Sequence, residues 1–134
     1  MSPRRPYLVV ALCVLALVAA ACGGGGEPVT FGEGELPSSV PDGFPVPRDA
    51  VVGSSMVDRA NHRTEFSLTL RGEMADAVHY YTVSLVSAGF VVDRSQGDAL
   101  AWRIDFSRGE VRGNLVIRSG GPGLAAVLVG LNTS

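Results

Sequence analysis

Lysine is absent from this sequence, because all eleven basic residues among its 134 are arginine. The absence excludes chemistry that needs a lysine amine, including Schiff-base formation and phosphate binding by a P-loop. Cysteine is also scarce, since only Cys13 and Cys22 occur. Cleavage between them would leave one cysteine, which forms no internal disulfide and builds no thiolate zinc cluster. We therefore expect a fold without a disulfide, a metal or a cofactor.

Positive charge is limited as well. If Arg4 and Arg5 leave with a cleaved segment, nine arginines face thirteen acidic residues, which gives a net charge of about −4. A mildly acidic chain lacks the basic patch that nucleic-acid binding requires, so no nucleic-acid partner is expected. With 46% hydrophobic residues, a chain of this length is long enough for one compact domain and too short for two.

The N-terminal segment has the pattern of a secretory signal. Residues 1–7 contain two arginines, and residues 8–21 form an uninterrupted apolar run. The run is shorter than the about 20 apolar residues that cross a bilayer. A charged start, a short apolar middle and small residues at its end are typical of a signal peptide that is removed.

The letters AAAC, from Ala19 to Cys22, resemble the lipobox of bacterial lipoproteins. The resemblance implies that residues 1–21 are cleaved and that the sulfur of Cys22 carries a diacylglycerol, which anchors the chain on the extracytoplasmic side of the cell membrane. Ala19 departs from the leucine usual in that family. An uncleaved helix or a plain secretory signal remains an alternative. Arg4 and Arg5 also resemble a twin-arginine signal, so the export route stays open.

Residues 22–40 are rich in glycine, proline and serine, and the composition predicts a flexible tether. A domain is expected from residue 41 to residue 134. Near its start, prolines flank Phe44 and favour an extended segment. We expect Phe44 to pack against the edge of the domain.

Periodicity predicts an α+β domain in which one helix packs across one face of an antiparallel sheet. Apolar residues three or four apart predict the helix over 73–88, and Gly89 followed by Phe90 fits its C-terminal cap. Alternation predicts about five or six strands in the order ββαβββ(β), over residues 51–58, 64–71, 90–94, 100–106, 111–118 and 124–131. In the fourth of these, Trp102 is expected to face the core.

This order of elements, the aromatic pair Tyr80 and Tyr81, and the Gly89-Phe90 helix end together resemble a widespread small lipoprotein domain. The resemblance covers about residues 41–131. It implies the fold alone, because that family has no established activity.

Candidate catalytic residues are few. His62 falls in an expected turn and His79 on a helix flank, and neither lies near a nucleophile motif. Ser54 and Ser55 offer hydroxyls without a neighbouring base. Asp93 and Asp98 lack the spacing of a calcium loop, so we interpret them as part of a polar turn. The sequence predicts no catalytic site.

Two surfaces are candidates for recognition. The outer helix face presents Tyr80 and Val83. The sheet face opposite the core is expected to gather guanidinium groups, which suit carboxylates and phosphates. We name this candidate binding face the arginine face, and its residues are Arg71, Arg103, Asp105, Arg112, Asn114 and Arg118. The alternative for both surfaces is a solvated exterior without a ligand.

These patterns predict a membrane-anchored cell-envelope lipoprotein that is a non-catalytic binding or accessory module. Its partners would be the membrane, through lipid on Cys22, and an envelope protein, a polymer, a small ligand or an anionic envelope component. Two alternatives remain open, namely an envelope-acting enzyme with an unrecognised site and a structural spacer without a specific ligand.

Overall fold

The computed structural model describes residues 28–134. The predicted signal peptide, the lipidation residue Cys22 and the start of the predicted tether lie outside the described residues.

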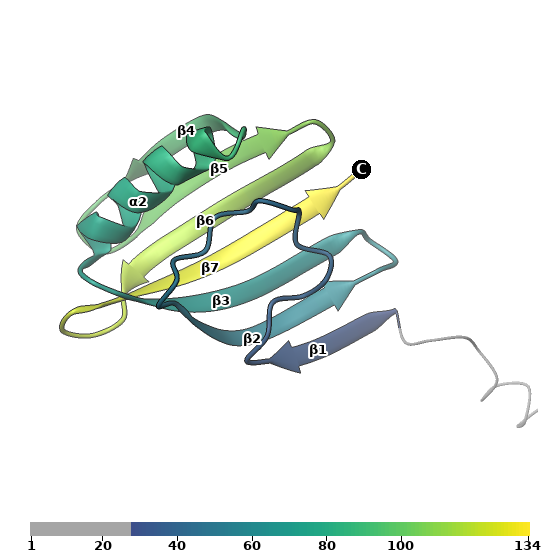
Figure 1. Ribbon diagram of the computed structural model, residues 1–134, viewed down its shortest axis with the longest axis horizontal. Helices are drawn as coiled ribbons and strands as arrows, with labels where there is room; N and C mark the ends of the chain where they lie inside the picture. The colour runs from purple at the N-terminus through teal and green to yellow at the C-terminus, as the bar shows by residue number, and fades with distance from the viewer. Residues whose placement is uncertain (1–27) are drawn as a thin grey trace, which may run out of the picture.

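In this part of the chain, seven strands form one antiparallel sheet and one helix packs against it (Figure 1). The strands lie side by side in the order β1-β2-β3-β7-β6-β5-β4, so β7 occupies the centre. The elements are β1 Val29–Glu33, β2 Val51–Asp58, β3 Arg63–Arg71, α2 Met74–Ser87, β4 Val91–Gly97, β5 Trp102–Arg108, β6 Val111–Ser119 and β7 Leu124–Thr133.

The structure confirms the α+β class and corrects the number and order of the strands. The observed order is βββαββββ, because an additional strand, β1, precedes the first predicted one. It pairs with β2 from Val29 opposite Asp58 to Glu33 opposite Ser54. The short run Val29-Thr30-Phe31 suits a strand, but the surrounding glycines and prolines led us to assign it to the tether. The folded domain therefore begins before residue 41.

Alternation along the strands determines which sheet face is buried. In β3, Phe66, Leu68 and Leu70 are buried, whereas the residues between them are half-buried or exposed. Neighbouring strands contribute to the same buried face, with Ile104, Phe106, Leu115, Ile117, Ala125, Val127, Val129 and Leu131. On the opposite face, which we call the open face, no helix of residues 28–134 lies over the sheet (Figure 1).

Helix α2 begins and ends close to the predicted residues. At its start, the backbone N–H of Glu73 donates to Oδ2 of Asp76 at 2.8 Å. At its end, Gly89 adopts a φ of 85°, and the N–H of Phe90 donates to the carbonyl of Leu85 at 2.9 Å. This arrangement confirms the predicted glycine cap, because a positive φ is accessible to glycine without strain.

A helix and a chain segment of the described residues cover the buried face. Figure 1 shows α2 over the half of the sheet that contains β4 and β5, and the segment between β1 and β2 over the other half. Phe44, in that segment, is buried, and its ring centroid lies about 6 Å from those of four other rings, Phe66, Tyr81, Phe90 and Phe106. The prediction that Phe44 packs at the domain edge was wrong, because its ring is buried among four other aromatic rings.

Arg108 holds this covering segment to the end of the helix. Its Nη1 donates to the carbonyl of Ala88 at 3.1 Å, and its Nη2 donates to the carbonyl of Asp42 at 2.8 Å. Its guanidinium carbon lies 4.2 Å from the ring centroid of Phe90. A cation at a helix C-terminus also interacts favourably with the helix dipole.

Trp102 faces the core side as predicted but is only half-buried. It lies at the start of β5, where its Nε1 donates to Oγ of Ser95 at 2.9 Å. Its position at the end of a hairpin leaves part of the ring exposed.

Candidate functional site

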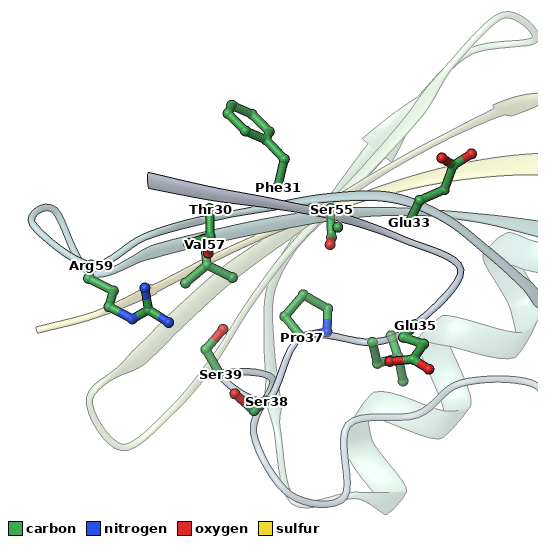
Figure 2. Close-up of a pocket in the computed structure, with 12 residues that line it drawn as sticks. Thr30, Phe31, Glu33, Glu35, Pro37, Ser38, Ser39, Ser55, Val57 and Arg59 are labelled. Carbon is green, nitrogen blue, oxygen red and sulfur yellow. The ribbon is translucent and has the colours of Figure 1, made fainter. Parts of the chain in front are cut away.

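A pocket of about 410 Å³ lies between the first two strands and the segment that follows β1. Figure 2 shows its two walls facing each other. Thr30, Ser55 and Val57 point from the strands toward the segment that contains Pro37, Ser38 and Ser39 (Figure 2). We call this cavity the serine pocket.

The pairing of β1 with β2 determines which side chains enter the serine pocket. Thr30 lies opposite Val57, and Gly32 opposite Ser55, so these four residues share one face. Phe31 points to the other side of the strand (Figure 2). Its side chain, 80% exposed, therefore lies on the open face.

Gly32 keeps the floor of the pocket open. A Cβ atom at this position would lie 2.8 Å from Oγ of Ser55, closer than non-bonded atoms normally approach. Gly32 is not among the glycines with positive φ, so its backbone does not require glycine. Ser55 is only 9% exposed, and its hydroxyl makes no side-chain hydrogen bond with another residue of the described chain. Glycine at position 32 thus leaves a nearly buried hydroxyl facing the pocket.

Hydrogen bonds hold the far wall in place. Oγ of Ser39 lies 2.7 Å from Oγ1 of Thr64, which is 5% exposed on β3. The N–H of Gly34 donates to the carbonyl of Gly53 at 3.0 Å, which fixes the chain where it leaves β1. The pocket is therefore part of the folded domain and forms without a ligand.

Opposite charges lie at the two ends of the pocket. Figure 2 shows the guanidinium of Arg59 at one end and the carboxylate of Glu35 beside Pro37 at the other. Neither side chain forms an ion pair with another described residue. The pocket thus offers hydroxyls along its length, a donor group at one end and an acceptor group at the other.

Sequence reasoning missed the serine pocket because it placed both β1 and the far wall in a flexible tether. Ser55 was considered only as a nucleophile without a base. The available signal was the pair of serine doublets, Ser38-Ser39 and Ser54-Ser55, but their proximity depends on a strand pairing that local patterns do not reveal.

The residues of the predicted arginine face lie on the open face of the sheet, as alternation requires. Arg103 and Asp105 alternate with buried Ile104 and Phe106, and Nε of Arg103 lies 2.8 Å from Oδ1 of Asp105. Asn114 is the register partner of Asp105 on β6. These residues form one group around the middle of β5 and β6.

The four arginines do not form a single cluster. Arg103 pairs with Val116, which makes Arg118 its diagonal neighbour. Arg71 and Arg118 pair with different residues of β7, which separates them by one strand. Arg112 lies near the β5–β6 turn, where its Nη1 donates to the carbonyl of Gly109 at 3.0 Å. The register thus makes Arg103 and Arg118 diagonal neighbours on adjacent strands and leaves Arg71 and Arg112 farther from them.

On the second predicted surface, the outer helix face, the two predicted residues differ in exposure. Tyr80 is half-buried and packs edge-to-face on Tyr81, with ring centroids 5.0 Å apart. Val83 is exposed on the outer side of α2, as predicted.

The predicted turn residues have local roles. Oδ1 of Asp98 accepts hydrogen bonds from the N–H groups of Leu100 at 2.8 Å and Ala101 at 3.0 Å, and these bonds lower the pKa of its carboxyl. This geometry confirms the polar-turn interpretation for Asp98. The same interpretation was wrong for Asp93, which lies within β4. His62 lies in the exposed β2–β3 turn with a φ of 51°, and His79 is exposed on α2.

Within residues 28–134, His, Cys, Asp and Glu side chains do not gather into a group of three that could hold a metal ion. In the same residues, no helix combines the length and apolarity needed to cross a membrane. Comparisons with protein-family models, curated proteins and solved structures found no match for this chain.

Proposed function

We propose that this protein is a lipoprotein of the cell envelope, anchored through Cys22 on the extracytoplasmic side of the membrane, and that its domain is a non-catalytic binding module. The main observation is the sequence that ends at Cys22, in which a charged start and a short apolar run precede AAAC. Two or more acyl chains hold a protein durably on a bilayer, because each buried methylene contributes about 0.8 kcal/mol.

The start of the folded domain is compatible with such an anchor. β1 begins at Val29, seven positions after Cys22. Because an extended chain spans at most about 3.5 Å per residue, the start of β1 would lie within roughly 25 Å of the anchor. The serine pocket, whose wall contains β1, would therefore be held near the membrane surface.

A binding role is supported by the serine pocket, since a spacer has no need for a preformed polar cavity. The open face is a second candidate surface, on which Arg103 and Arg118 would contact an envelope protein or an anionic envelope component. Arginine side chains suit carboxylate and phosphate groups in such partners.

Mass spectrometry of the protein extracted from membranes tests the anchor. We expect a mature chain that begins with a lipid-modified Cys22, and we expect Cys22→Ser to abolish the modification and release the protein from the membrane fraction. Recovery of a membrane-bound chain that still begins with Met1 and carries no lipid would refute the proposal.

A further inference from the structure

We infer that the serine pocket binds a neutral sugar unit. This inference rests on the proposed binding function and names the ligand class for its pocket. Its starting point is the hydroxyl of Ser55, which is nearly buried, faces the pocket and makes no side-chain hydrogen bond within the described chain. Among the described residues only the Tyr81 hydroxyl is buried without a partner, so the Ser55 hydroxyl remains open to the pocket, where a ligand hydroxyl can form a hydrogen bond with it.

Gly32 supplies an independent observation. Its φ lies outside the left-handed region, so another residue would suit its backbone, and an interior glycine weakens a strand. A Cβ atom there would lie 2.8 Å from Oγ of Ser55 and would obstruct this hydroxyl. Glycine at position 32 therefore lowers the stability of the strand but leaves the Ser55 hydroxyl accessible from the pocket. This combination is expected for a recognition site.

The lining of the pocket combines hydroxyl groups with apolar surface. Thr30, Ser38 and Ser39 add hydroxyls, and the Pro37 ring and the Val57 side chain add apolar contacts. A sugar ring has the matching chemistry, with hydroxyls around its edge and C–H groups on its faces. A hydrocarbon ligand would leave the serine hydroxyls without partners. The pocket volume of about 410 Å³ lies within the usual range for small-molecule sites.

The charges at the pocket ends favour a neutral ligand. The Arg59 guanidinium attracts an anion, but the Glu35 carboxylate in the same pocket repels it. For a neutral sugar both groups are useful, because a guanidinium donates to ring or hydroxyl oxygens and a carboxylate accepts from hydroxyl groups.

The experiment is a titration of the purified full chain, followed by calorimetry and by amide chemical shifts, with the methyl glycosides of glucose, galactose, mannose and N-acetylglucosamine. We expect saturable millimolar or tighter binding of at least one glycoside, with the largest shifts at Thr30, Gly32 and Ser55. Inorganic phosphate and glycine serve as the anionic and zwitterionic probes.

Variants locate the site. We expect Ser55→Ala and Gly32→Ala each to weaken sugar binding about tenfold, while Ser54→Ala, an exposed neighbour on the other side of β2, leaves it unchanged. Thermal unfolding of each variant shows whether the fold is retained. Ser55→Ala removes only a hydroxyl that has no side-chain partner within residues 28–134, so it keeps the test valid if Gly32→Ala is unstable.

Three results would each overturn the inference: no saturable binding of any of the four glycosides, saturable binding of phosphate or glycine in their place, or sugar binding that Ser55→Ala leaves unaltered. The mass spectrum of the same preparation reports Cys22 separately. Sugar binding by a chain without lipid would refute only the anchor, and a lipidated chain without sugar binding would refute only the ligand class.

Discussion

Replacing Tyr81 with phenylalanine is expected to stabilise the protein. Tyr81 lies on the buried side of α2, where its side chain is fully buried and its hydroxyl has no hydrogen-bond partner among the described residues. A phenylalanine ring would keep the packing of the aromatic ring against Phe44, at 6.3 Å between centroids, and against Tyr80, at 5.0 Å. The substitution removes only the group that is buried without a partner.

The expected magnitude is the difference between two opposing effects. Burial of an unsatisfied hydroxyl costs about 1–3 kcal/mol. Removal of the oxygen leaves a gap no larger than a methyl group, which costs about 1 kcal/mol. We therefore expect Tyr81→Phe to raise the free energy of unfolding by about 1 kcal/mol at neutral pH. Tyr80→Phe is the matched control, and for this half-buried residue the expected change is within about 0.5 kcal/mol of zero.

The effect of Tyr81→Phe is expected to grow in alkali. Burial raises the pKa of the Tyr81 hydroxyl above its ordinary value. In the unfolded chain this hydroxyl ionises near pH 10, whereas in the folded chain it stays protonated, so the unfolded state binds fewer protons above that pH. The contribution of Tyr81 to stability is therefore complete below about pH 10 and is lost as the pH rises further. A phenylalanine has no such loss. The difference in the free energy of unfolding between the variant and the parent should therefore increase by up to about 1.4 kcal/mol for each pH unit above about 10.

Urea unfolding at neutral pH and at several pH values above about 10, followed by Trp102 fluorescence, measures both effects. A loss of 1 kcal/mol or more in Tyr81→Phe at neutral pH would refute the reasoning, because it would mean that the hydroxyl makes a favourable hydrogen bond. Equal alkaline slopes for the parent and the variant would contradict the argument from burial.

Two further substitutions test how the segment between β1 and β2 is attached. Phe44→Ala should lower the free energy of unfolding by about 3–5 kcal/mol, because the buried ring packs against four other aromatic rings. Phe44→Leu should lower it by less. A loss below about 1 kcal/mol in urea unfolding of Phe44→Ala would show that the segment does not contribute to the core. Arg108→Met should lower the free energy of unfolding by about 2 kcal/mol, because it removes two hydrogen bonds to backbone carbonyls. Arg108→Lys should retain only part of this free energy, since an ammonium group lacks the planar fork of a guanidinium. Unchanged thermal stability of Arg108→Met would contradict the assigned role.

Local sequence patterns were sufficient to predict features that depend on a residue and its near neighbours, namely which side of a strand is buried and where the helix ends. The alternation of Phe66, Leu68 and Leu70 with polar residues identified the buried face of β3, because successive strand residues point to opposite sides. The helix and its Gly89 cap were predicted for the same reason, since both depend on contacts within one turn. The open-face position of Arg103 and Asp105 also followed from alternation.

Local patterns were insufficient where distant segments meet. The strand propensity of residues 29–33 is weak by itself, and their pairing with β2 joins residues more than twenty positions apart. Alternation placed the arginines on one face of the sheet but did not predict the distances between them. Those distances depend on the strand order β3-β7-β6-β5. For this reason only Arg103 and Arg118, of the four predicted arginines, are diagonal neighbours on adjacent strands.

The sequence by itself determined the α+β class, the inward and outward faces of the strands and the prediction of an anchor at Cys22. Only the tertiary structure decided that Phe44 packs among four other aromatic rings, that Arg108 joins the covering segment to α2, and that Ser55 and Ser39 line one pocket. The physical reason is that periodicity and capping are properties of a short stretch of chain. The choice of partner for a strand, a ring or a hydroxyl depends instead on which distant surfaces the whole fold brings within contact distance.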